Sequence, residues 1–377
     1  MIIYGKQTID QEDIESVINI LKSDFLTTGP KVYEFEKNFA NYVGSKYAVA
    51  VSNGTAALHL TCLSLGISEG DEVICTPMTF AASVNCVLYC GATPVFVDVD
   101  ENGLMDASLI EEKITSKTKA IIPVHYSGLS CNTKLIKGIA DKHNLKIIED
   151  GCHALGTEIF EYKIGSCINS DLCIFSFHPV KHITTGEGGM ITTNDEELYN
   201  KLLKLRTHGI TKNAGEFICE SQGPWYYEMQ DLGYNYRITD IQCALGVSQL
   251  KKIDNFLDKR RSIAKKYDNA FKNNKNIDLL KSDNNCLNSY HLYVIKLKDE
   301  KTRLQLFNHL KDNQIYCQVH YIPVHLHPYY QKLGFKKGEL PNAEDFYNRV
   351  ISLPMYPNLT DEEVDYVIDK VQNFFKK

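Results

Sequence analysis

The chain has 377 residues, of which 44% are hydrophobic and 23% are charged, and its formal net charge at pH 7 is −6. These values exclude a disordered or low-complexity chain, and the acidic balance argues against a strongly basic surface for nucleic acids. At about 150 residues per domain, the length predicts two to three domains, or one large α/β domain with a smaller appendage.

The sequence shows no sign of export or of a membrane anchor. The N-terminal residues MIIYGKQTIDQEDIE contain no apolar segment of the kind that a signal peptide needs. The most apolar run, 80–97, is interrupted by Asn85, Gly91 and Pro94, so we expect no membrane-spanning helix. None of the 12 cysteines forms a CxxC pair, so we expect no zinc site, and we expect a cytoplasmic protein with reduced thiols.

The first 250 residues alternate between strand and helix patterns. Asp10 can cap a helix whose apolar face carries Ile14, Val17, Ile18 and Leu21. The predicted strands cover 47–51, 71–76, 93–100, 119–126, 145–150, 171–177 and 189–193, and helices are predicted at 52–60, 80–89 and 133–143. Apolar strands that alternate with amphipathic helices predict a mostly parallel sheet with helices on both faces.

Near residue 239 the pattern changes. Residues 239–271 contain no proline and predict one nearly continuous helix that leads into a second unit. That unit has strand patterns at 289–297 and 315–321 and helix patterns at 302–311, 342–351 and 361–375. We therefore predict an α/β fold with a large domain at 1–250 and a smaller α+β domain at 251–377.

A segment of small residues, SNGTAA at 52–57, lies between a predicted strand and a predicted helix. Small residues at a helix N-terminus let backbone N–H groups approach an anion, and the Thr55 hydroxyl can add a donor. Such turns are also common as plain strand-to-helix connections. On its own, the segment favours a plain turn.

A carboxylate closes the predicted strand at 145–150. Asp150 lies at the strand end, where open α/β sheets place groups that contact ligands. There it can hold a cationic ring nitrogen, and His153 can support it by a hydrogen bond. The competing interpretation is that Asp150 caps the next turn.

A lysine follows the predicted strand at 171–177. Lys181 lies among apolar and small residues, before the glycine-rich turn TTGEGG, and Ser176 can face an anion. A lysine taken partly out of water has a lowered pKa and can act as a nucleophilic amine. A solvated surface cation is the usual state of a lysine, and the apolar approach to Lys181 weakens that interpretation.

Polar side chains gather in the loop before the long helix. Tyr234, Asn235, Tyr236 and Arg237 precede Thr239, the predicted helix cap. Such a loop indicates a site more often than a core, although a packed loop is the alternative. An anion site, a strand-end aspartate and a strand-end lysine, in this order, are what pyridoxal phosphate requires.

With these motifs the chain resembles the DegT/StrS-type sugar-nucleotide aminotransferases, which are fold-type I pyridoxal-phosphate enzymes. The resemblance extends over essentially the whole chain. It rests on the segments LTTGPKVYEFE, SNGTAAL, TPMTFAAS, EDGCHALG, FSFHPVKHITTGEGG, GYNYRITDIQCALG and VHYIPVH. The C-terminal part is most similar to one branch, the UDP-4-amino-4,6-dideoxy-N-acetyl-β-L-altrosamine transaminases of pseudaminic-acid synthesis.

The resemblance implies a role for each matching residue. Lys181 would be the Schiff-base lysine and Asp150 the partner of the pyridine nitrogen. His153 would lie beside a cofactor oxygen, and Phe80 would stack on the ring. The implied phosphate site comprises Asn53, Gly54, Thr55 and Ser176, with Asn235 reaching the cofactor of a neighbouring subunit in a homodimer. The implied substrate residues are Thr28, Gly29, Tyr236, Arg237, His320 and Tyr321.

The resemblance also implies a reaction. L-Glutamate would give its amino group to C4 of a nucleotide-linked 4-keto-6-deoxy sugar, with UDP-2-acetamido-2,6-dideoxy-β-L-arabino-hex-4-ulose as the expected acceptor. A dTDP- or GDP-linked keto-sugar is the alternative acceptor. Lys181 would act both as the displaced group and as the proton carrier.

Three other functions have to be weighed. A sugar dehydratase of the same fold would have histidine in place of Lys181. A non-catalytic regulatory relative would be expected to lack Lys181 or Asp150, and both are present. A metal enzyme would use the histidines of HYIPVHLH, but that segment lacks a recognisable metal-ligand spacing, so we expect no metal there.

Overall fold

A seven-stranded sheet forms the centre of the computed structural model, which describes residues 1–283 and 285–376. Its order is β2 (Tyr47–Val51), β10 (Gly189–Thr193), β9 (Leu172–Ser176), β6 (Lys146–Asp150), β5 (Thr118–Ile122), β3 (Glu72–Cys75) and β4 (Thr93–Phe96). β10 is antiparallel to both of its neighbours, and the other neighbouring pairs are parallel. The predicted mostly parallel sheet and all seven of its strands are confirmed.

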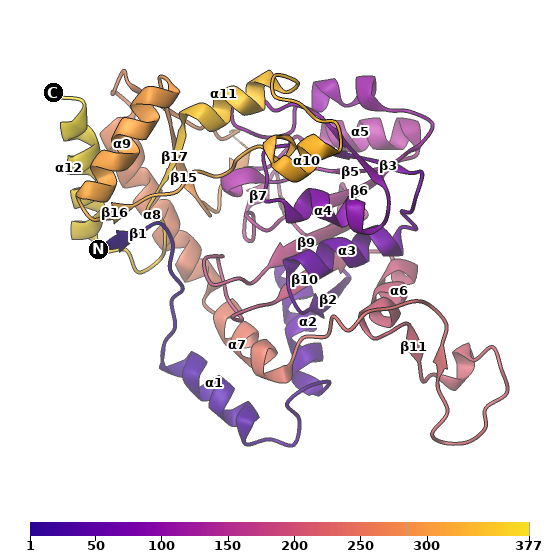
Figure 1. The fold of residues 1–377 in the computed structure, drawn as a ribbon. Coiled ribbons are helices and arrows are strands. Elements are labelled where there is room, and N and C mark those ends of the chain that lie inside the picture. Colours follow the sequence, from indigo (N-terminus) through magenta and orange to yellow (C-terminus); the bar gives the residue numbers. More distant parts are fainter. Residues whose placement is uncertain (284, 377) are drawn as a thin grey trace.

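Helices cover both faces of this sheet (Figure 1). The strands are apolar on both sides: Val49 and Val51 of β2 pack in a cluster with residues of α3 (Gly54–Ser64), whereas Ala48 and Ala50 pack with residues of α2 (Pro30–Val43). The remaining helices of this unit are α4 (Ala82–Tyr89), α5 (Thr133–His143), α6 (Glu196–Arg206) and α7 (Asp240–Leu250). Burial on both faces explains why the strands are continuous apolar runs.

The predicted helix over 239–271 is wrong as a single element. The structure has α7 and then α8 (Ile253–Phe271), separated at Lys251 and Lys252. α7 buries residues such as Val247 in the core that it shares with α2, whereas the second half of α8 packs in a different core. The break lets each helix bury its own apolar face.

That different core belongs to the second unit. Its antiparallel sheet has the order β13 (Ile277–Leu279), β15 (Tyr293–Leu297), β17 (Val350–Leu353), and its core includes residues of α8, α9 (Glu300–Asp312) and α12 (Asp361–Phe374). The shorter elements are α10 (Pro328–Lys332), α11 (Pro341–Arg349), β7 (Glu158–Ile159), β8 (Tyr162–Lys163), β11 (Ile210–Thr211), β12 (Glu228–Met229) and β14 (Cys286–Leu287). Of the predicted strand over 315–321, only β16 (Ile315–Tyr316) forms.

The N-terminus lies beside the second unit (Figure 1). β1 (Ile2–Ile3) pairs in parallel with β16, and Ile2 is buried in the core of the second unit. We still propose a boundary near residue 250, and the first residues then belong with the C-terminal unit.

The first helix, α1 (Gln11–Leu21), begins where the sequence predicts. Asp10 and Asp13 form a reciprocal capping box, with both hydrogen bonds at 3.1 Å. Part of the apolar surface of α1 is not covered, because Ile14, Ile18 and Leu21 remain 45%, 39% and 57% exposed, whereas Ile20 is buried. Among the described residues, no helix is both long and apolar enough to cross a membrane.

Candidate active site

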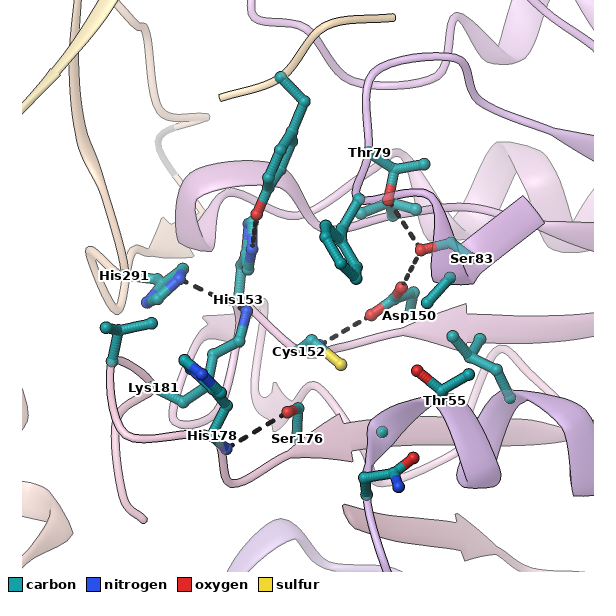
Figure 2. A pocket seen from close by; sticks show the side chains of 18 of the residues that line it. Thr55, Thr79, Ser83, Asp150, Cys152, His153, Ser176, His178, Lys181 and His291 are labelled. Carbon is teal, nitrogen blue, oxygen red and sulfur yellow. Dashed lines mark hydrogen bonds between the residues drawn. The ribbon is translucent and has the colours of Figure 1, made fainter. Parts of the chain in front are cut away.

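A cavity of about 750 Å³ opens at one edge of the central sheet. The carboxyl ends of β2, β6 and β9 and the start of β10 lie at this edge, since β10 runs opposite to its neighbours. Asp150 is the last residue of β6, and Ser176 is the last residue of β9. The strand ends therefore bring residues distant in sequence into one cavity, which Figure 2 shows from close by.

The N-terminus of α3 forms one wall. Asn53 caps this helix, and its side-chain oxygen accepts a hydrogen bond from the N–H of Ala56 at 2.8 Å. A Cβ on Gly54 would lie 3.0 Å from Cβ of Ser176, and a Cβ on Gly189 would lie 2.5 Å from the carbonyl oxygen of Asn53. Glycine is thus required for the close approach. First-turn N–H groups, together with the hydroxyls of Thr55 and Ser176, fit a phosphate.

Asp150 is buried and held by two donors. The Ser83 hydroxyl donates to Oδ2 at 2.6 Å, and the backbone N–H of Cys152 donates to Oδ1 at 3.0 Å. Ser83 is held in turn by Thr79, with 2.7 Å between the hydroxyl oxygens. Bonds to both oxygens suit an ionised carboxylate, which can pair with a cationic ring nitrogen.

An aromatic ring, that of Phe80, forms part of a second wall of the cavity. Phe80 lies just before α4 and lines the cavity, and it is still 64% exposed. A large ring so exposed beside a cavity leaves its face open to a planar ligand.

Lys181 projects into the cavity from the turn that follows β9. Burial lowers the pKa of its amine, and the nearby Cys152 and Asp150 oppose this effect only in part. A lower pKa increases the unprotonated fraction, which is the nucleophilic form. Nζ of Lys181 lies 3.5 Å from Nε2 of His291.

Three buried histidines of this cavity, His153, His291 and His320, are kept neutral. Nδ1 of His153 accepts a hydrogen bond from the N–H of Ser127 at 3.3 Å, and its Nε2 lies 2.9 Å from the Tyr321 hydroxyl. Burial lowers the pKa of His153 and of His291 well below the usual range, and it lowers the pKa of His320 to about 3. These three imidazoles therefore carry no charge at neutral pH, and the Nδ1 bond leaves Nε2–H of His153 to donate to Tyr321.

The sequence-predicted residues fall into three groups. The cavity is lined by Asn53, Gly54, Thr55, Phe80, Asp150, His153, Ser176, Lys181, Tyr236, His320 and Tyr321. Thr28, Gly29 and Arg237 instead line a separate hollow of about 230 Å³. Asn235 is exposed, and its backbone pairs with Thr207. Within one chain, these last four residues are not brought to Lys181.

Sequence reasoning missed several residues of the cavity. Tyr4, Thr79, Ser83 and His291 all line it, although none is close in sequence to Asp150 or Lys181. For Ser83 a signal was present, because the TPMTFAAS segment that contains Phe80 also contains this serine. Tyr4 comes from the N-terminal segment and His291 from the second unit, and no local pattern marks either of them.

The histidines His320 and His325 of segment 320–327, which were weighed as metal ligands, lie within hydrogen-bond distance of other side chains of the chain. Nδ1 of His320 lies 2.8 Å from the Ser352 hydroxyl, and Nε2 of His325 lies 3.0 Å from a carboxylate oxygen of Glu344. In the part of the chain that the structure describes, no group of three or more His, Cys, Asp or Glu side chains is arranged to hold a metal ion.

The sheet and the cavity at its edge define a fold-type I pyridoxal-phosphate enzyme. Residues 7–372 match the model of the DegT/DnrJ/EryC1/StrS aminotransferase family, and the chain belongs to that family. It is a sugar aminotransferase, and pyridoxal phosphate is its cofactor.

Similar proteins match over nearly their full length. The spore coat polysaccharide biosynthesis protein SpsC of Bacillus subtilis is 43% identical, over 99% of this chain and 97% of its own. A UDP-4-amino-4,6-dideoxy-N-acetyl-β-L-altrosamine transaminase of Campylobacter jejuni is 39% identical, over 100% and 98%. The solved structure of Helicobacter pylori PseC, an aminotransferase involved in the biosynthesis of pseudoaminic acid, has 34% identity and a TM-score of 0.92, over 100% and 99%.

Proposed function

We propose that this chain transfers the amino group of L-glutamate to C4 of a nucleotide-linked 4-keto-6-deoxy sugar. The preferred acceptor is UDP-2-acetamido-2,6-dideoxy-β-L-arabino-hex-4-ulose, of pseudaminic-acid synthesis. The observation that carries the proposal is the half-buried Lys181 amine, with its lowered pKa, in the same cavity as Asp150. The similarity to the Campylobacter transaminase and to PseC supports the particular sugar.

The residues of the cavity fit the cofactor, and each then has a distinct task. Asn53, Gly54, Thr55 and Ser176 would hold its phosphate, and Asp150 would hold its ring nitrogen. Lys181 would attach to it covalently. When bound, the cofactor supplies an electron sink for the carbon that loses a proton.

The protein's own groups would manage the proton and the substrate. Once released, the Lys181 amine would carry the proton between donor carbon and cofactor, since an amine with a lowered pKa both accepts and returns a proton readily. His320, Tyr321 and Tyr236 would contact the sugar nucleotide, because all three line the cavity and none of them is needed to hold the cofactor phosphate.

A homodimer with shared sites is part of the proposal. The uncovered face of α1 gives a second copy an apolar surface to bind. Asn235 would then reach the phosphate in the partner subunit's cavity, and Thr28, Gly29 and Arg237 would lie beside the partner's substrate.

The function is tested by incubating the loaded protein with glutamate and a panel of UDP-, dTDP- and GDP-linked 4-keto-6-deoxy sugars. Mass spectrometry of the products should show one amino group gained, with the UDP-linked N-acetyl sugar converted fastest. A faster reaction with a dTDP- or GDP-linked sugar would replace the proposed acceptor. Failure of every sugar, with glutamate consumed to 2-oxoglutarate, would overturn the sugar as acceptor.

A further inference from the structure

Among the described residues, the amine of Lys181 has one hydrogen-bond partner, Nε2 of His291, and the two nitrogens are 3.5 Å apart. Asp150 is engaged elsewhere, since its oxygens accept from Ser83 and from the N–H of Cys152. His291 is 4% exposed, and it comes from the second unit, just before β15. The nucleophile of one unit is therefore in contact with an imidazole of the other (Figure 2).

A buried arginine holds the backbone that carries this imidazole. Arg260 of α8 is 1% exposed, and its guanidinium donates to the carbonyl oxygens of Tyr290, His291 and Met355 at 3.2, 3.3 and 3.0 Å. Tyr290 has a φ of +48°, a conformation that is costly for a bulky residue and persists only where surrounding contacts impose it. The three bonds from Arg260 supply that constraint.

The same segment is bound to the large unit on its other side. His182, next to Lys181, has Nε2 3.3 Å from the carbonyl oxygen of Ser289. The Ser289 hydroxyl donates to the carbonyl of His153 at 3.2 Å, and the N–H of Leu292 donates to the carbonyl of Ser127 at 3.3 Å. Bonds on both sides of residue 291 leave its imidazole little freedom to move away from Lys181.

The imidazole of His291 is suited to accept a hydrogen bond. Burial and the Lys181 charge keep it neutral, so one ring nitrogen has a free lone pair. Nδ1 is buried, and nothing in the described chain hydrogen bonds to it. Within the described chain, Nε2 is therefore the ring nitrogen that has a partner, and that partner is the Lys181 amine.

We propose that His291 is a positioning residue, whose Nε2 accepts a hydrogen bond from the Lys181 amine and holds that amine in the cavity whenever it is detached from the cofactor. Arg260 holds His291 in that place through the backbone. The inference rests on the function proposed for Lys181. It explains why a flexible side chain with four rotatable bonds would stay ready for proton transfer after its release.

The test replaces His291 by glutamine, asparagine and leucine. The side-chain amide of glutamine can occupy the position of Nε2, so this variant can still accept a hydrogen bond from Lys181. The shorter amide of asparagine lies at the position of Nδ1, and leucine has no polar atom at either position. In the reaction with glutamate alone, His291→Leu and His291→Asn should be slower by about one to two orders of magnitude, the effect of one hydrogen bond to a charged amine. With 2-deuterated glutamate they should show a larger isotope effect, and His291→Gln should stay near the wild type.

A second readout needs no cofactor. Trace acetylation of the cofactor-free protein over a range of pH, followed by peptide mass spectrometry, gives the pKa and reactivity of the Lys181 amine. Loss of the acceptor should lower that pKa in His291→Leu and His291→Asn relative to His291→Gln, because the bond to Nε2 favours the charged amine. The Gln and Asn variants carry this comparison even if His291→Leu does not fold.

The control is His325→Leu, which removes a buried imidazole that does not line the cavity of Lys181. It should lower thermal stability and leave both the isotope effect and the Lys181 pKa unchanged. Equal isotope effects and equal pKa values in all His291 variants would overturn the proposed role. If the wild type itself takes no amino group from any donor, the proposed function fails instead.

Discussion

The Ser83 hydroxyl donates to Oδ2 of Asp150 over 2.6 Å and so ties α4 to the end of β6. A hydrogen bond to a charged group contributes about 1.5–3 kcal/mol. Ser83→Ala should therefore lower the rate of the glutamate reaction roughly ten- to one-hundred-fold, measured by stopped-flow absorbance. Ser64→Ala is the matched control, because this buried serine bonds a carbonyl within α3, outside the cavity. Equal rates in both variants would contradict the role of Ser83.

Lys181→Met should lower the rate of turnover by several orders of magnitude, because the variant has neither the covalent link to the cofactor nor the proton carrier. In the cofactor-free protein it should also raise the free energy of unfolding at neutral pH, because burial lowers the pKa of Lys181 from 10.5 and so penalises its charged form. Between the folded and unfolded pKa values the unfolded chain binds more protons, so wild-type stability rises with pH.

The difference in free energy of unfolding between Lys181→Met and the wild type should therefore be largest below the pKa that Lys181 has in the folded protein. It should shrink as the pH rises toward 10.5. Urea unfolding of both proteins at neutral and at alkaline pH measures it. A constant or growing advantage would show that the amine is not penalised by burial.

Gly189→Ala should disrupt the phosphate site. The added Cβ would lie 2.5 Å from the carbonyl oxygen of Asn53, where no real contact is tolerated, so the N-terminus of α3 must move. We expect affinity for pyridoxal phosphate to fall by at least about tenfold, the effect of losing one charge-assisted bond. Gly138→Ala is the control: it lies in open space within α5, and it should stabilise the fold by up to about 1 kcal/mol without affecting the cofactor.

Mixing two inactive chains tests the shared site. Lys181→Ala and Asn235→Ala/Arg237→Ala subunits, unfolded together and refolded, should regain part of the activity, because one site of the hybrid dimer has both sets of groups intact. Each variant refolded alone gives the baseline. If Asn235 served its own chain, every hybrid site would carry a lesion and mixing would restore nothing.

Ile18→Glu places a charge on the uncovered apolar face of α1, where Ile18 is 39% exposed. The variant should be monomeric in analytical ultracentrifugation, since a buried unpaired charge strongly opposes association. Glu12→Gln, in the first turn of the same helix, should leave the oligomeric state unchanged. A dimeric Ile18→Glu protein would place the interface elsewhere.

The central sheet and its edge could be predicted because their signals are local. The strands that carry Asp150 and Ser176 are short apolar runs between polar turns, and parallel strands place their carboxyl ends together. The split between α7 and α8 could not be predicted, because no proline or glycine marks Lys251 and Lys252. The break depends on which core each helix faces, and that is set by contacts distant in sequence.

Dependence on contacts distant in sequence also explains why the sequence did not predict the cavity residues that come from the second unit. His291 lies within a segment that predicts a buried strand, and its contact with Lys181 exists only after two units pack together. The apolar stripe of α1 was predicted correctly, whereas its exposure was not, since periodicity tells which face is apolar and not what covers it.

Pairing of Ile2 with Ile315 has a consequence for the order of events on the ribosome. The central sheet is complete once β10, ending at Thr193, has emerged, so the Asn53 and Asp150 sides of the cavity can form early. The N-terminal residues have no partner strand until most of the polypeptide has been synthesised, and His320 is made later still. The wall that carries Tyr4, His291 and His320 is therefore completed last, after the strands beside Asn53 and Asp150 have been made.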